Sequence, residues 1–152
     1  LTVDCDDNFL DFIFNSVKPD YIQLHGNEKP SRCVEIKKKY KTKIIKALEV
    51  KNIDMLLSEI NNYKNIADLL LLDSPKSIMP GGNGKPFDWN MLNENDFDED
   101  WLLAGGLNEK NIHKAVNLTN PSGVDISSGV EIAKGKKSPQ LIKNFVRICR
   151  NI

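Results

Sequence analysis

The sequence contains few of the residues that form metal sites and disulfide frameworks. Its 152 residues include three cysteines, Cys5, Cys33 and Cys149, and two histidines, His25 and His113. The cysteines are odd in number and widely spaced, and neither histidine stands at a spacing typical of zinc sites. The sequence therefore predicts neither a bound metal ion nor a fold held by disulfides.

The sequence also lacks an excess of charge and a long apolar run. It has 21 basic and 21 acidic side chains, so it carries no net field that would attract nucleic acid or acidic membranes. No apolar stretch approaches the roughly 20 residues of a membrane span, and no signal peptide opens the sequence. We expect no nucleic-acid partner, no membrane partner and a cytoplasmic location.

Short apolar segments alternate with segments of helical periodicity along the whole sequence. We predict strands at residues 1–4, 21–24, 44–50, 69–72, 102–104 and 124–126. Helices are predicted at residues 7–17, 30–40, 53–60, 109–116 and 139–148, and Asp88 is a plausible N-cap for a further short helix. This alternation is typical of an α/β fold with a parallel sheet and right-handed crossovers. Because no linker or repeat interrupts it, residues 1–152 are predicted to form a single domain.

One apolar run ends abruptly in a carboxylate. Leu69 to Leu72 precede Asp73, and the glycine-rich segment Gly81-Gly-Asn-Gly-Lys-Pro-Phe-Asp-Trp89 follows. The run indicates a parallel strand buried on both faces, although periodicity alone does not exclude a buried helix. A charged residue at the C-terminal end of such a strand lies where α/β barrels place their chemistry. Taken alone, however, an aspartate in this position more often only caps the loop.

Two further segments favour the chemical interpretation. Trp101-Leu-Leu-Ala-Gly-Gly-Leu-Asn108 and Gly123-Val-Asp-Ile-Ser-Ser-Gly-Val-Glu131 are short apolar strands that end in glycines or hydroxyls before a predicted helix. Glycine lets a backbone approach a ligand closely, and a helix N-terminus offers unpaired N–H groups to an anion. Two consecutive turns of this kind match the phosphate site of many TIM barrels. We therefore predict that backbone N–H groups of Gly105-Gly106 and Ser127-Ser128 converge on one phosphate site.

The predicted strand–helix units number six, which is too few for a closed eight-stranded barrel of about 250 residues. We expect the C-terminal three quarters of a TIM (β/α)8 barrel, with roughly two units missing from its front. The segments at residues 1–4 and 124–126 would then be open sheet edges. Such edges favour self-association, because they expose unpaired N–H and C=O groups.

At this point four segments together resemble phosphoribosylanthranilate isomerase. They are Tyr21-Ile-Gln-Leu-His-Gly-Asn-Glu28; Leu72-Asp73 with the glycine-rich segment; Leu103-Ala-Gly-Gly-Leu-Asn108; and Val124-Asp-Ile-Ser-Ser-Gly-Val-Glu131 with Gly135-Lys-Lys137. They occur in the family's order and span nearly the whole chain. The resemblance implies a TIM barrel of tryptophan biosynthesis. It also implies conversion of N-(5-phosphoribosyl)anthranilate to 1-(2-carboxyphenylamino)-1-deoxyribulose 5-phosphate, an Amadori rearrangement that needs no cofactor or metal.

The resemblance also implies roles for individual residues. Asp73 would be the general acid, and a cysteine on the family's first strand, which has no counterpart here, would be the general base. Cys5 falls just beyond the third strand of the family, where no catalytic cysteine is expected. The implied residues for substrate and phosphate binding are His25, Gly81, Gly82, Gly84, Lys85, Gly105, Gly106, Asp125, Ser127, Ser128 and Gly129.

Two departures and two alternatives accompany this reading. Asn83 and Pro86 stand where the family usually has hydroxyl residues, and the role of His25 is either substrate contact or packing at a strand end.

Another phosphate-binding barrel enzyme, such as indole-glycerol-phosphate synthase or a pentose-phosphate epimerase, is less consistent with Asp73 and the glycine loop. A catalytically inert phosphate-binding fragment is the alternative from a different class, because the expected base is missing and the chain itself is then inactive.

Overall fold

The computed structural model describes residues 1–75, 87–92 and 97–152. The strands of its main sheet are β1 (Tyr21–Leu24), β2 (Lys43–Glu49), β3 (Leu69–Asp73), β4 (Trp101–Leu103) and β5 (Gly123–Val124). The helices are α1 (Asp7–Ser16), α2 (Pro30–Tyr40), α3 (Ile53–Tyr63), α4 (Ile112–Thr119) and α5 (Pro139–Cys149), with the 3-10 helices η1 (Trp89–Leu92) and η2 (Ser128–Val130). A two-stranded hairpin, β6 (Glu131–Ala133) with β7 (Lys136–Lys137), precedes α5.

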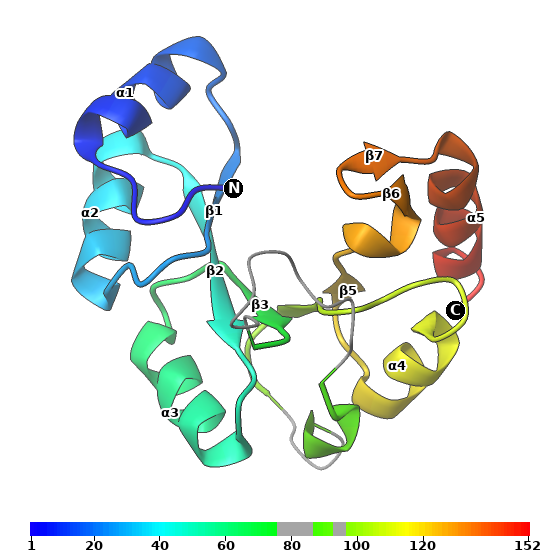
Figure 1. Cartoon of the computed structure of the whole chain (residues 1–152). Coiled ribbons are helices and arrows are strands. Elements are labelled where there is room, and N and C mark those ends of the chain that lie inside the picture. Colours follow the sequence, from blue (N-terminus) through cyan, green and yellow to red (C-terminus); the bar gives the residue numbers. More distant parts are fainter. Residues whose placement is uncertain (76–86, 93–96) are drawn as a thin grey trace.

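The main sheet is parallel, and its strands lie side by side in chain order, β1-β2-β3-β4-β5. Helices lie outside the curved sheet, and the elements form an open arc with the N-terminus and α5 toward its two ends (Figure 1). Within the described residues the arc does not close into a ring. Because the strands are parallel, all their C-terminal ends lie at one edge of the sheet, where a site can be built.

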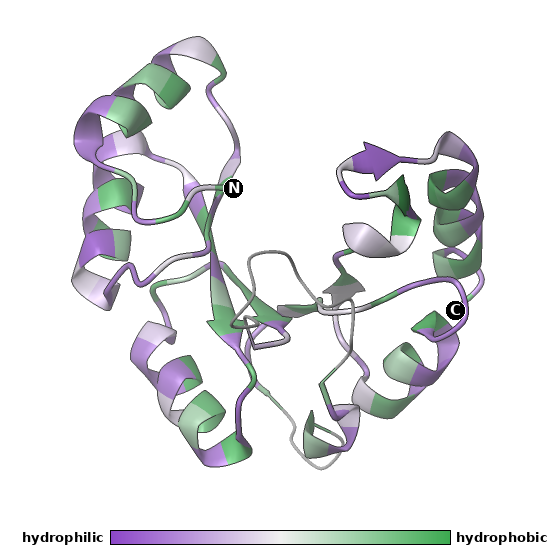
Figure 2. Ribbon diagram, in the orientation of Figure 1, coloured by the Kyte–Doolittle hydropathy of each residue, from purple (hydrophilic) through white to green (hydrophobic). Residues whose placement is uncertain are grey.

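The two faces of the sheet carry different apolar clusters. The larger cluster joins the outer face to the helices and includes Leu24, Leu48 and Leu72. A smaller cluster of Ala47, Leu71 and Ala104 lies on the inner face. Apolar residues accordingly dominate the central strands (Figure 2). Because side chains alternate along a strand, Asp73 lies in phase with Leu71 and therefore faces the interior.

The helix boundaries follow from their first residues. Asp6 and Asn52 accept hydrogen bonds from the N–H groups of Phe9 and Met55, at 2.9 Å in both cases, and so cap α1 and α3. Pro30 and Pro139 stand in the first turns of α2 and α5, where the missing N–H costs no intrahelical bond. Within the described residues no helix is long and apolar enough to cross a membrane.

Three sequence predictions need correction. The predicted strand at residues 1–4 is a single bridge between Thr2 and Leu24, because Asp4 turns the chain away with a φ of +47°. The fourth long helix begins at Ile112 rather than at residue 109, because Asn108 accepts a hydrogen bond from the N–H of Lys110 and forms a turn first. The strand predicted at residues 124–126 ends at Val124, and the β6–β7 hairpin was not predicted.

Candidate active site

Residues at the C-terminal ends of four strands meet at the inner rim of the sheet. We call His25, Asp73, Gly105 and Asp125 the mouth cluster. His25 follows β1, Asp73 ends β3, Gly105 lies just beyond β4, and Asp125 follows β5. Thus residues separated by up to 100 positions in the sequence occupy one edge, as sequence analysis predicted for parallel strands.

Asp73 and His25 face one another across the mouth. The Nε2 atom of His25 lies 3.5 Å from the Oδ2 atom of Asp73. Both side chains are mostly buried, with 20% of the His25 side chain and 27% of the Asp73 side chain exposed. The side-chain amide nitrogen of Gln23 lies 3.0 Å from Nδ1 of His25. Because an amide NH2 group only donates, Nδ1 accepts, and the proton of a neutral ring is on Nε2, toward Asp73.

The other oxygen of Asp73 is held by the residue that follows it. Oδ1 accepts hydrogen bonds from the N–H of Ser74 at 2.7 Å and from its hydroxyl at 3.3 Å. This contact fixes the carboxylate plane while leaving Oδ2 toward His25. The loop-capping role considered for Asp73 is therefore present, and it coexists with exposure of the second oxygen to the mouth.

Gly105 allows β4 to approach β3 closely at this edge. Its φ is +84°, and a Cβ there would lie 2.7 Å from the backbone nitrogen of Ser74 and 3.0 Å from Oδ1 of Asp73. Any side chain would be strained and would displace the carboxylate. Gly106 also has a positive φ, +69°, and its carbonyl accepts a hydrogen bond from the Asn111 side chain at 2.9 Å.

Asp125 brings a second carboxylate to the mouth. Burial, and then the negative charge of Asp73, raise its pKa, whereas His25 and Lys137 lower it. These influences show that the ends of β1, β3 and β5 share one electrostatic environment. A basic residue, Lys137, adjoins it and donates to the carbonyl and hydroxyl oxygens of Ser127, both at 2.8 Å.

The two turns predicted to hold phosphate are in direct contact. Gly129 packs against the β4–α4 turn so closely that a Cβ would overlap the carbonyl oxygen of Leu107. Among the described residues, no backbone hydrogen bond outside helices and strands involves the N–H of Gly106. The structure thus brings the two turns together on one side of the sheet, and their role in binding phosphate stays a prediction.

The remaining predicted binding residues have different outcomes. Ser127 and Ser128 lie at the start of η2, next to Gly129. Gly81, Gly82, Gly84 and Lys85 lie outside the described residues. No group of three or more His, Cys, Asp or Glu side chains among the described residues could hold a metal ion.

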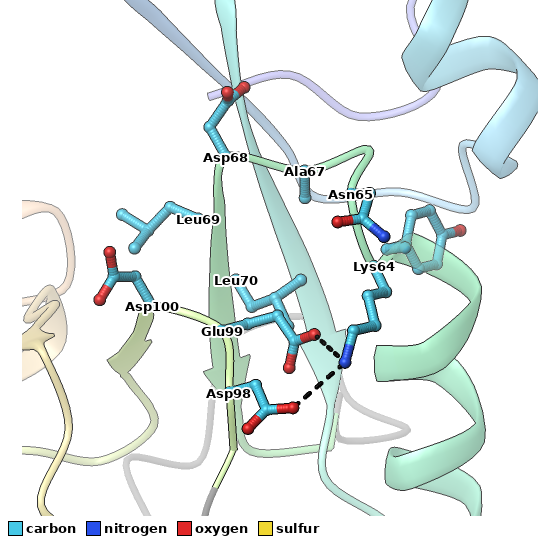
Figure 3. A pocket seen from close by; sticks show the side chains of 10 residues that line it. Lys64, Asn65, Ala67, Asp68, Leu69, Leu70, Asp98, Glu99 and Asp100 are labelled. Atoms are coloured by element: carbon cyan, nitrogen blue, oxygen red, sulfur yellow. Dashed lines mark hydrogen bonds and ion pairs between the residues drawn. The ribbon is translucent and has the colours of Figure 1, made fainter.

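A separate hollow lies at the opposite edge of the sheet. It has a volume of about 370 Å³ and lies around the N-terminal ends of β3 and β4 (Figure 3). Its cation, Lys64, forms ion pairs with Asp98 and Glu99 at 3.3 Å in both cases. Because the hollow is on the far side from the mouth cluster, we do not assign it to the site.

The cysteines lie away from the mouth cluster. Cys33 is buried in the outer core on α2, and burial raises the pKa of its thiol to about 11, so the thiol stays protonated at neutral pH and cannot accept a proton. Cys149 ends α5, and the thiol of Cys5 donates to the carbonyl of Val3 at 3.6 Å. Cys5 packs against the outer apolar cluster, and its lack of a catalytic role stays a prediction.

Sequence reasoning missed three charged residues near the site. Lys137 appeared only within the segment Gly135-Lys-Lys137 and was given no role. The buried ion pair between Lys46 and Glu28, at 3.1 Å, was not predicted. A signal for Lys46 existed: it stands between Ile44 and Leu48 in the helix-facing phase of β2. A lysine in that phase has to be buried.

Comparison with known proteins now decides the family. The family model for N-(5'-phosphoribosyl)anthranilate (PRA) isomerase matches residues 1–148. This chain belongs to the PRA isomerase family. A PRA isomerase of Parvibaculum lavamentivorans is 44% identical over 156 residues, a match that covers 99% of this chain and 72% of the relative. One of Mesorhizobium japonicum is 47% identical over 153 residues, covering 99% and 69%.

Solved PRA isomerase structures share the fold. The Thermotoga maritima enzyme superimposes with a TM-score of 0.84 at 32% identity, over 99% of this chain and 71% of that one. Another PRA isomerase was solved in complex with reduced 1-(o-carboxyphenylamino)-1-deoxyribulose 5-phosphate, and it matches with a TM-score of 0.77 at 28% identity over 99% and 70% of the two chains. The predicted TIM-barrel fold class and the family resemblance are therefore confirmed.

Proposed function

We propose that this protein isomerises N-(5'-phosphoribosyl)anthranilate to 1-(2-carboxyphenylamino)-1-deoxyribulose 5-phosphate in tryptophan biosynthesis, with Asp73 as the general acid. The observation that carries the proposal is the placement of the Asp73 carboxylate, 3.5 Å from His25, at the end of the sheet that also holds the two contacting turns. Membership of the family supports the reaction, and this geometry supports the role of Asp73.

The chemistry requires a proton at the ring oxygen of the sugar. Asp73 donates it as the C1–O bond breaks, while the anthranilate nitrogen supplies the electron pair that forms the Schiff base. A base then removes the C2 proton, the resulting enol becomes the ketone, and Asp73 recovers its proton in the course of turnover. Asp125 brings a second carboxylate to the same edge of the sheet, and the charge of Asp73 contributes to raising the pKa of Asp125.

The phosphate would lie between the β4–α4 turn and η2. The N–H group of Gly106 would donate to an anion there, and the hydroxyl of Ser127 is oriented by Lys137. The N-terminal end of a helix after a glycine turn favours negative charge. A basic residue near the turn adds to the attraction, so a sugar phosphate is the class of ligand that fits.

The proposal extends to the surroundings of the protein. A cytoplasmic location suits an enzyme that uses a phosphorylated biosynthetic intermediate. Self-association through the edge beyond β5 is also expected, because among the described residues no strand pairs with that side of β5. Sedimentation velocity over a range of concentrations tests it, and a concentration-independent monomer would contradict it.

The test of the function uses the native gene. Asp73→Asn keeps the shape of the side chain but removes the transferable proton, so isomerase activity in cell extracts should fall by about 10²–10⁴-fold. Loss of substrate fluorescence measures the rate.

The matched control is Asp6→Asn. Asp6 is far from Asp73 in the sequence, and asparagine preserves the N-cap of α1. Its extracts should keep the wild-type rate. If Asp73→Asn extracts also do so at equal protein level, Asp73 is not the acid.

A further inference from the structure

We infer that Lys46 and Glu28 form a positioning pair for His25, a role that rests on the proposed function. His25 presents its imidazole to Asp73 on the inner face of the sheet, whereas Lys46 and Glu28 are buried on the outer side, with 3% and 4% of their side chains exposed. The pair acts on His25 through the backbone that flanks it.

Lys46 holds the carbonyl groups on both sides of His25. Its Nζ atom donates to the carbonyl of Leu24 at 3.3 Å, to that of Gly26 at 2.8 Å and to Oε2 of Glu28 at 3.1 Å. An ammonium group has three protons, and these three acceptors use all of them. The lysine therefore has no donor left for any ligand, which excludes a direct catalytic role.

Glu28 holds the N–H groups of the same loop. Its carboxylate accepts from the N–H of Gly26 and from the N–H of Asp4, both at 2.9 Å. The N–H of His25 itself donates to the carbonyl of Thr2 at 2.9 Å. The backbone around His25 is thus fixed from both the lysine and the glutamate.

Neighbouring residues leave the loop little room to move. A Cβ on Gly26 would lie 2.5 Å from a carboxylate oxygen of Asp4, so the loop packs tightly against the N-terminal segment. The hydroxyl of Tyr63 donates to the carbonyl of Glu28 at 2.7 Å. The ring of Tyr63 lies 5.7 Å from Nζ of Lys46.

Stability alone does not account for this pair. Burying two charges costs desolvation free energy, and replacing such a pair by apolar residues of similar size is often neutral or stabilising. A hydrophobic pair would serve the outer core, but it could not bind the carbonyls of Leu24 and Gly26. The geometry therefore favours a role in fixing the loop that carries His25.

The test separates position from stability. Lys46→Met leaves Glu28 buried without its partner and should lower stability, so the informative protein is the double variant Lys46→Met/Glu28→Gln. It removes both charges. Glutamine keeps one acceptor oxygen, for the N–H of either Asp4 or Gly26, and the double variant lacks the ammonium group that binds the two carbonyls. Lys43→Met, on the same strand and exposed, is the control.

Two readouts follow the position of the imidazole. The first is the NMR cross-peak of the His25 ring. The sequence has only two histidines, His25 and His113, so the peak that disappears in His25→Asn is that of His25. The second is the affinity for reduced 1-(o-carboxyphenylamino)-1-deoxyribulose 5-phosphate, the reduced product analogue, measured by calorimetry. In the double variant we expect a folded protein with lower resistance to urea, because buried backbone groups lose their partners. We also expect a displaced His25 cross-peak and about tenfold weaker binding, the size of one lost polar contact.

A double variant with a wild-type cross-peak and wild-type affinity would overturn the inference. A double variant that does not fold would overturn it as well, because the pair would then serve the fold itself. If the unmodified chain does not bind the analogue, the proposed function is at fault, and the His25 cross-peak still decides whether the pair positions the ring.

Discussion

Gly129 and Leu107 are in such close contact that no side chain fits between them, since a Cβ on Gly129 would overlap the carbonyl oxygen of Leu107. This contact joins η2 to the β4–α4 turn. It brings Ser128 and Gly106 to the same region, although 22 positions separate them in the sequence. The geometry of the proposed phosphate site therefore depends on a glycine at position 129.

Gly129→Ala should separate the two turns. We expect a loss of about 1–3 kcal/mol in the free energy of unfolding, as is typical of overpacking, together with weaker phosphate binding. Urea denaturation and calorimetry measure the two effects. Gly135→Asn is the control: Gly135 has no atom within 4 Å of an added Cβ and a φ of +75°, which asparagine tolerates. Equal stability of Gly129→Ala and the wild type would contradict the account.

The ionised side chain of Asp125 should lower the free energy of unfolding at neutral pH. Burial and the charge of Asp73 raise its pKa above the ordinary value of 3.8. The folded state therefore binds the proton on the Asp125 carboxyl more tightly than the unfolded state does. This difference stabilises the fold fully below pH 3.8, and the stabilisation is lost as pH rises through the pKa of the folded state. Asp125→Asn should raise the free energy of unfolding at pH 7 and leave it nearly unchanged near pH 3. A variant that is less stable than the wild type at pH 7 would contradict this reasoning.

The purified 152 residues span 72% of the length of the Parvibaculum relative and should lack the isomerase activity that we propose for the product of the native gene. None of the three cysteines is at the mouth cluster, because all three pack in or against the outer apolar cluster. Turnover is expected to stay below roughly 1 per second, the low end of ordinary enzymes. The assay is loss of fluorescence from phosphoribosylanthranilate, with added reduced product analogue as a specificity control. Faster turnover that Cys5→Ser abolishes would make Cys5 the base after all.

The arrangement of strands was largely predictable from local pattern. Tyr21–Leu24 and Pro30–Tyr40 have the predicted bounds, because apolar alternation and a proline at a helix start are local signals. Asp73 was predictable for the same reason, since the four leucines before it place it at the end of a strand. Parallel strands then required its neighbours at the same edge.

The hydrogen-bond and ion-pair partners of individual side chains were not predictable. The burial of Lys46 is compensated by carbonyls of Leu24 and Gly26, which lie 20 or more positions away. The late start of α4 depends on the side chains of Asn108 and Asn111, which form a turn that competes with the helix. The β6–β7 hairpin is held by Lys137, whose ion pair with Glu131 at 2.8 Å has no signature in hydrophobic periodicity.

We expect the C-terminal edge of the sheet, and not the hollow around Lys64, to bind the phosphorylated substrate. A ¹H–¹⁵N NMR titration of the chain with reduced 1-(o-carboxyphenylamino)-1-deoxyribulose 5-phosphate measures this directly. Saturable shifts should be largest at the amides of Gly106, Ser128 and Gly129. Shifts gathered at Lys64 and Asp98, or none that saturate, would contradict it.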